Sequence, residues 1–207
     1  MLKRKMGRYL LTLLVITGLA GTIEDNTLSK NERKFALTLM KETYKEVVKA
    51  TKGLSEAQLN FKAAPDKWSV KECLYHIAAI EKMLWGMFEN VTKTAANPEK
   101  RSQIKLTDEQ VVNMVEDRTK KAQAPEQALP KNTGYKSTDD VLADFKKTRT
   151  EHIRYMKTTT ADLRNHVVQF PVGWIDAYQV YLYLAAHSNR HLQQIQEIKA
   201  SPAFPAK

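Results

Sequence analysis

Apolar residues recur every three or four positions over long stretches of this 207-residue chain, and this spacing limits what the chain can fold into. It places the apolar side chains on one face of a helix, whereas a half-buried strand needs apolar and polar residues to alternate. Glycine and proline, which interrupt helices, number only 7 each. Alternating stretches are too rare for a sheet of any size. The pattern therefore predicts an all-α protein, a bundle of four main helices with an additional short helix.

The sequence also marks where several helices begin. Ser69 with Glu72, and Thr107 with Gln110, form the capping-box pattern that satisfies free N–H groups at a helix start. Ser137 opens another helix in a similar way. The expected helices cover 31–52, 69–89, 107–121, 137–157 and 176–199, with a short helical turn within 54–67 and loops at 92–105 and 158–173.

The N-terminal residues have the layout of a secretory signal peptide. Basic residues (Lys3 to Arg8) precede an apolar run (Leu10 to Leu19) and small residues around Ala20. The run is shorter than the roughly 20 residues that span a membrane. We therefore expect export to a periplasmic or extracellular space, without stable membrane insertion after cleavage. An uncleaved anchor and a buried first helix are the alternatives. The expected organisation is a signal peptide at 1–20, a polar spacer at 21–30, one helical domain at 31–200 and a C-terminal tail at 201–207.

The charge distribution argues against nucleic acid as a partner. The formal net charge is +10, but four of the basic residues lie in the leader, which leaves +6 for the mature chain. The remaining basic residues are mixed with acidic ones, whereas nucleic-acid binding needs a clustered basic face.

Three histidines form a candidate metal site. His187 and His191 are four residues apart, so both side chains lie on one face of the last helix and can reach one ion. They are in register with its apolar stripe and point inward. His76 lies on the inward side of the helix that starts near Ser69, and would supply a third ligand if the two helices touch. The alternative is a set of hydrogen-bonded core or rim histidines.

The single cysteine, Cys73, has two interpretations. It cannot form an internal disulfide, and an isolated cysteine is usually a small buried hydrophobic residue. Because it lies three residues before His76 on the same helix face, it could instead share a metal with that histidine.

Other residues near these helices have weaker signals. Glu81 is either a hydrogen-bond acceptor behind the site or a surface carboxylate. His152 and His166 are expected to be structural or exposed. Trp68 and Trp174 each precede a histidine-bearing helix, and both are expected to fill the mouth of the bundle.

Two segments resemble the DinB-like superfamily, which includes the YfiT-type thiol transferases. The first runs from Trp68 through Glu72 to His76 and Glu81, and the second has the form H-x-x-x-H-x-x-Q-I from His187 to Ile195. Gly173-Trp174 is similar to the family's entry to the last helix, and the likeness spans roughly residues 31–200 in order and spacing.

The resemblance implies an up-down-down-up four-helix bundle that binds one divalent metal, zinc or nickel, through His76, His187 and His191. It also implies metal-dependent transfer with low-molecular-weight thiols or hydrolysis of a small-molecule substrate, and a homodimer as the oligomer to test. Ser188 stands where relatives often have a glutamate, so no acid–base role is transferred to that position.

The leading hypothesis is an exported metal-dependent enzyme acting on a small molecule. Hydrolysis is preferred over thiol transfer, because low-molecular-weight thiols belong mainly to the reducing cytosol. Two alternatives stay open: a non-catalytic helical bundle that binds a small molecule, and a structural bundle whose histidines hold no metal.

Overall fold

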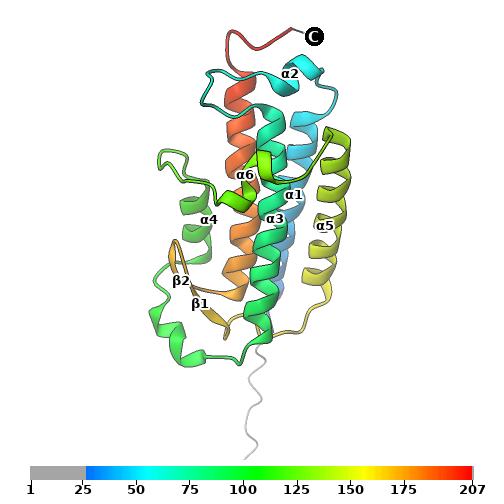
Figure 1. The fold of residues 1–207 in the computed structure, drawn as a ribbon. Coiled ribbons are helices and arrows are strands. Elements are labelled where there is room, and N and C mark those ends of the chain that lie inside the picture. Colours follow the sequence, from blue (N-terminus) through cyan, green and yellow to red (C-terminus); the bar gives the residue numbers. More distant parts are fainter. Residues whose placement is uncertain (1–26, 207) are drawn as a thin grey trace, which may run out of the picture.

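The computed structural model describes residues 27–206. The expected signal peptide and residues 21–26 of the expected spacer lie outside the described residues. Within this range, four long helices form the bundle: α1 (Lys30–Thr51), α3 (Val70–Lys93), α5 (Thr138–Thr158) and α6 (Ala177–Lys199). In Figure 1, α1 and α6 run upward and α3 and α5 run downward. The predicted up-down-down-up bundle is therefore confirmed.

Shorter elements connect these helices. The predicted helical turn after α1 is α2 (Glu56–Asn60), and the predicted third helix is α4 (Asp108–Glu116), which packs against α6. Three 3₁₀ turns complete the connections: η1 (Pro98–Gln103), η2 (Glu126–Ala128) and η3 (Pro130–Asn132). The last two belong to the connection 117–137 between α4 and α5, which crosses α3 (Figure 1).

The predicted capping boxes are present. Ser69 caps α3 together with Glu72, and Thr107 caps α4 together with Gln110, each through two reciprocal hydrogen bonds. The side chain of Ser137 likewise accepts a hydrogen bond at the start of α5. Because the caps satisfy N–H groups that the helix itself leaves free, they set where each helix starts.

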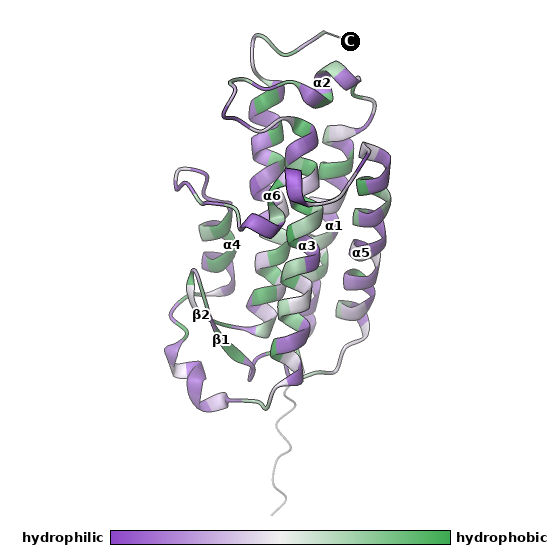
Figure 2. Ribbon diagram, in the orientation of Figure 1, coloured by the Kyte–Doolittle hydropathy of each residue, from purple (hydrophilic) through white to green (hydrophobic). Residues whose placement is uncertain are grey.

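The core lies between α6 and its neighbours. Most of α6 is buried, from Ala177 to Ile198, and its closest packing is against α3, α1 and α4. Figure 2 shows hydrophobic residues along α3 and α6, whereas η1 and η2 are largely hydrophilic. No helix within residues 27–206 has both the length and the hydrophobicity of a membrane span.

Two sequence-based expectations about elements are corrected. The segment 158–173 is not wholly a loop, because β1 (Val167–Phe170) pairs antiparallel with β2 (Gly173–Asp176). Pro171 and Val172 form the turn, and Gly173 has φ +113°, which favours glycine. Each strand has only four residues, too few for a clear alternating pattern.

The helix expected to reach residue 121 ends at Glu116 instead. Asp117 accepts hydrogen bonds from the backbone N–H and the hydroxyl of Thr119, which forms a turn in place of further helix.

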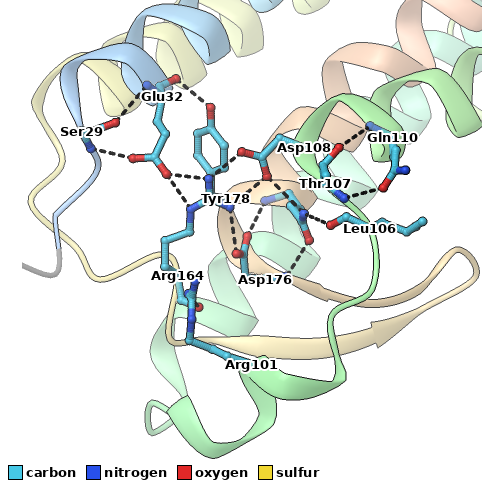
Figure 3. A network of polar contacts seen from close by, with 11 residues as sticks. Ser29, Glu32, Arg101, Leu106, Thr107, Asp108, Gln110, Arg164, Asp176 and Tyr178 are labelled. Carbon is cyan, nitrogen blue, oxygen red and sulfur yellow. Dashed lines mark hydrogen bonds and ion pairs between the residues drawn. The ribbon is translucent and has the colours of Figure 1, made fainter.

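One arginine connects the starts of three helices at the lower end of the bundle (Figure 3). Arg164 contacts Glu32 in the first turn of α1 at 2.6 Å, Asp108 at the start of α4 at 2.6 Å, and Asp176 at the cap of α6 at 2.9 Å. Each carboxylate lies at a helix N-terminus, where negative charge is favourable. We refer to these four residues as the Arg164 cluster.

Candidate metal centre

The structure brings the three predicted histidines together. His76 comes from α3, and His187 and His191 come from α6; each offers a ligand nitrogen, and these nitrogens all lie within 4.8 Å of one another. The ring centroids of the three pairs are 4.6–5.2 Å apart. His76 and His191 are buried and His187 is half-buried. The contact between α3 and α6 supplies the proximity that spacing alone could not establish.

Hydrogen bonds orient two of the rings. Nδ1 of His76 lies 2.7 Å from the carbonyl oxygen of Ala128, and Nδ1 of His191 lies 3.0 Å from Oε1 of Gln194. Both partners are acceptors, so each Nδ1 carries the proton and donates it. The Nε2 lone pair of each ring is then free to bind a metal, which is the usual arrangement behind metal-binding histidines.

Burial keeps the three imidazoles neutral. It lowers the pKa of His76 and, more strongly, that of His187. Burial, together with the proximity of His76, lowers the pKa of His191 to about 3. A neutral imidazole has the lone pair that a metal needs, so all three side chains are in the ligand form at neutral pH.

The site is covered by an indole and by the connection 117–137. The ring of Trp68 stacks on His191 at a centroid distance of 5.8 Å and lies 4.8 Å from that of His76. Ala128, the acceptor for His76, belongs to η2 of the connection and is buried. Arg190 holds the start of the same connection, because its guanidinium donates to the carbonyl oxygens of Asp117 and Lys120.

The other residues that the sequence singled out are not part of the group of ligand nitrogens. Trp174 lies on β2 rather than at the histidines, because α3 and α6 are antiparallel and begin at opposite ends of the bundle (Figure 1). Cys73 is buried, which raises the pKa of its thiol, and it is outside the group of ligand atoms. His166 is half-buried just before β1.

Glu81 and His152 are both buried, and both lie outside the group formed by His76, His187 and His191. Nδ1 of His152 lies 2.8 Å from Oε1 of Glu81. The interpretation of Glu81 as a surface carboxylate is therefore wrong, and the expectation that His152 is structural fits its place in the core.

Arg149, which is fully buried beside Glu81, was not predicted from the sequence. A signal was available, because Arg149 occupies the apolar stripe of α5 between Phe145 and Met156. A charged residue in such a stripe needs a buried partner.

The donor set suits a divalent transition metal. Three neutral imidazoles are typical ligands of zinc, nickel and similar ions, and a three-ligand site leaves a coordination position for substrate. The partners of the two oriented rings, a carbonyl and an amide oxygen, add no negative charge of their own.

Comparison with known proteins identifies the family of this chain. A family model described as the DinB superfamily matches residues 39–195, which is most of the chain. The chain belongs to the DinB superfamily. This DinB protein is 27% identical over 175 residues to the uncharacterised protein YuaE of Bacillus subtilis, a match that covers 79% of this chain and 96% of YuaE.

A solved structure shares the fold. YfiT from Bacillus subtilis, described as a probable metal-dependent hydrolase with an unusual four-helix bundle topology, superposes with a TM-score of 0.57. The match covers 84% of this chain and 89% of YfiT at 14% sequence identity. At this identity the similarity establishes the shared fold.

Proposed function

We propose that this DinB protein is a metal-dependent hydrolase of a small-molecule substrate, with one zinc or nickel ion held by His76, His187 and His191. The observation that carries the proposal is the convergence of three neutral imidazoles from two helices, two of them buried and that of His187 half-buried. The description of YfiT as a probable metal-dependent hydrolase supports the same reaction class.

The protein's own groups hold and orient this centre. Ala128 and Gln194 fix two of the imidazole rings, and Trp68 together with the connection 117–137 covers part of the site. A bound divalent ion supplies Lewis-acid chemistry, polarising a substrate oxygen or favouring the thiolate form of a thiol. Partial burial of the ligands makes such polarisation more effective, because less water is present to screen it.

Thiol-dependent group transfer is the second candidate, and the charges around the site favour it. Arg190 and Arg118 lower the pKa of His191 after the larger effects of burial and His76. Arg190 donates to the backbone carbonyl oxygens of Val115, Asp117 and Lys120, so its guanidinium adds positive charge that suits an anionic group such as a thiolate.

Metal analysis of the tag-free protein tests the centre. We expect about one transition-metal ion per chain in the wild type, and loss of that ion in His76→Ala. His166→Ala is the matched control, since it removes a half-buried histidine from another part of the fold and should leave the metal content unchanged. No metal in the wild type after incubation with zinc and nickel would reject the proposal.

A substrate screen separates the two reactions. The zinc and nickel forms should be assayed on ester, amide and lactone substrates with a low-molecular-weight thiol present and absent. Turnover without thiol supports hydrolysis, and turnover only with thiol supports transfer. Tight binding of a small molecule without turnover in either condition would identify a binding protein and contradict both.

We also propose that the protein is exported after cleavage of residues 1–20. The support is the order of basic, apolar and small residues in this segment. Mass spectrometry of the protein secreted by cells expressing the full chain tests this. An N-terminus near residue 21 is expected, and soluble protein that retains Met1 would contradict cleavage.

A further inference from the structure

The guanidinium group of one α5 residue contacts the other three long helices of the bundle. Arg149 of α5 forms an ion pair with Glu81 of α3, with Nε–Oε1 and Nη2–Oε2 distances of 2.8 Å each. Its Nη1 donates to the hydroxyl of Thr43 on α1 at 3.1 Å, and its Nη2 donates to the hydroxyl of Ser188 on α6 at 2.5 Å. We refer to these four residues, with His152, as the Arg149 network.

The network is sealed from water. Arg149 is 0% exposed, and Glu81, His152 and Ser188 are at most 2% exposed. His152 donates from Nδ1 to Glu81, and Trp85 stacks on its ring at a centroid distance of 3.9 Å. The Glu81 carboxylate therefore has partners at both oxygens and a fixed position.

Stability alone does not account for such a network. Removing a carboxylate and a guanidinium from water is costly, and replacing a buried ion pair by apolar residues is often neutral or stabilising. The best attested use of buried polar groups is to specify one arrangement of helices over others. In this bundle, the directional hydrogen bonds of Arg149 select one rotation and one axial offset for each helix.

Two of the helices selected in this way carry the three histidines. Ser188 directly follows His187 in α6, and Glu81 lies five residues after His76 in α3, a rise of about 7.5 Å. Arg149 therefore bridges the two ligand-bearing helices close to their ligands. A metal centre needs its ligands held to within about 0.5 Å of the binding geometry.

We propose that Arg149 is a positioning residue for the metal centre, acting through Glu81 on α3 and Ser188 on α6. The inference rests on the proposed three-histidine centre. Arg149 does not touch the metal in this proposal; it holds α3 and α6 in the register that brings His76 into the same group as His187 and His191.

Thr43 provides a matched control. It and Ser188 are both buried hydroxyl residues that accept a hydrogen bond from Arg149, but Thr43 lies on α1, which carries none of the three histidines. Ser188→Ala and Thr43→Val each remove one hydroxyl from the network. If the network served stability only, the two variants would have similar effects on the metal centre.

The test compares these variants with the wild-type protein in Co²⁺ and Zn²⁺ titrations, with urea unfolding of the metal-free forms in parallel. The visible absorption of Co²⁺ reports coordination geometry, and competition with a chelating dye gives zinc affinity. We expect Ser188→Ala to change the Co²⁺ spectrum and to weaken zinc binding by up to about 10-fold, the lower value for loss of a group that hydrogen-bonds a ligand. The effect should not exceed this value, because Ser188 acts on the ligands through Arg149. Thr43→Val should keep the wild-type spectrum and affinity despite a similar loss of stability.

A second variant, on α3, tests whether the effect of Ser188→Ala is merely local to position 188. Glu81→Gln keeps the shape of the side chain on α3 but removes its charge, and should change the Co²⁺ spectrum in the same direction as Ser188→Ala. Wild-type affinity and spectrum in Ser188→Ala, or equal changes in Ser188→Ala and Thr43→Val, would overturn the positioning role. A wild-type protein that binds neither ion would instead reject the metal centre itself, and the positioning role with it.

Discussion

The Arg164 cluster and the histidine centre both join distant segments, but they do so with opposite charge arrangements. At the lower end, Arg164 supplies a cation among three carboxylates from α1, α4 and the cap of α6. In the upper half, three neutral imidazoles from α3 and α6 converge without a cation of the protein between them. The lower end therefore contains a cation of its own, whereas the histidine centre offers three neutral ligands that could hold a metal ion.

The largest expected difference between the two regions is in metal binding. His191→Ala removes one of the three ligands, and should weaken zinc binding by more than about 100-fold, the upper value for loss of an outer partner. Arg164→Met should leave zinc affinity unchanged, because the cluster lies at the other end of the bundle. Isothermal titration of both variants with zinc checks this, and equal weakening would show that the regions are not independent.

The Arg164 cluster should contribute strongly to the stability of the metal-free protein. Arg164→Met leaves the buried carboxylate of Asp176 without its cation, and burial already raises the pKa of that carboxyl. We expect a loss of about 3 kcal/mol in the free energy of unfolding, which is the lower end of the range for breaking a buried ion pair. The lower end applies because 19% of the Arg164 side chain is exposed.

Urea unfolding of metal-free protein measures this loss. Lys67→Met is the control, because it breaks an exposed pair with Asp66 and should leave the free energy of unfolding close to the wild-type value. A loss in Arg164→Met no larger than that in Lys67→Met would contradict the view that the cluster holds the helix starts together.

Much of the candidate site could be predicted from the sequence. The spacing of His187 and His191, and the inward place of His76, identified the three histidines that the structure brings together. The contact between their helices could not be read from periodicity, because it depends on which faces of α3 and α6 pack. Arg149 was missed because its partners, Glu81 and Ser188, lie 68 and 39 residues away.

The fold was predictable to the extent that the signals were local. The capping boxes marked the starts of α3 and α4, because they involve residues three apart. The hairpin of β1 and β2 was missed because four-residue strands carry too little pattern. The early end of α4 depends on a side-chain turn at Asp117.

A smaller effect should follow from the acceptors behind the histidines. Gln194→Ala removes the partner of Nδ1 of His191 and should weaken zinc binding about 10-fold. Gln193→Ala is the matched control, since the neighbouring side chain donates to the carbonyl oxygen of Glu116 instead. Equal zinc affinities in the two variants would show that Gln194 does not orient the ligand.

The last expected effect in this comparison is a pH dependence specific to the histidine centre. Burial lowers the folded-state pKa of His76 and His191 below the unfolded value near 6.5, so the unfolded chain binds more protons in mildly acidic solution. The stability of the fold is therefore independent of the titration of these histidines above about pH 6.5, and it falls as the pH decreases from there toward their folded-state pKa. The slope is up to about 1.4 kcal/mol per pH unit for each histidine.

Urea unfolding of the metal-free protein between pH 7 and about pH 5 tests this dependence against His191→Leu. The variant should show a shallower fall, because it no longer has to protonate this residue on unfolding. Identical slopes would mean that His191 is protonated to the same extent in both states.

The ligand positions have a further consequence for how distant parts of the chain are cross-linked. With Cys73 as its only cysteine, the chain has no internal disulfide, yet His76 and His187 are separated by 111 positions and belong to different helices. An ion that binds the folded form alone would act as a reversible cross-link between them. At a free concentration 1,000 times its dissociation constant it would add about 4 kcal/mol to the stability of the fold. The durability of this protein would then follow the metal supply of its surroundings, as that of disulfide-bonded proteins follows the redox state.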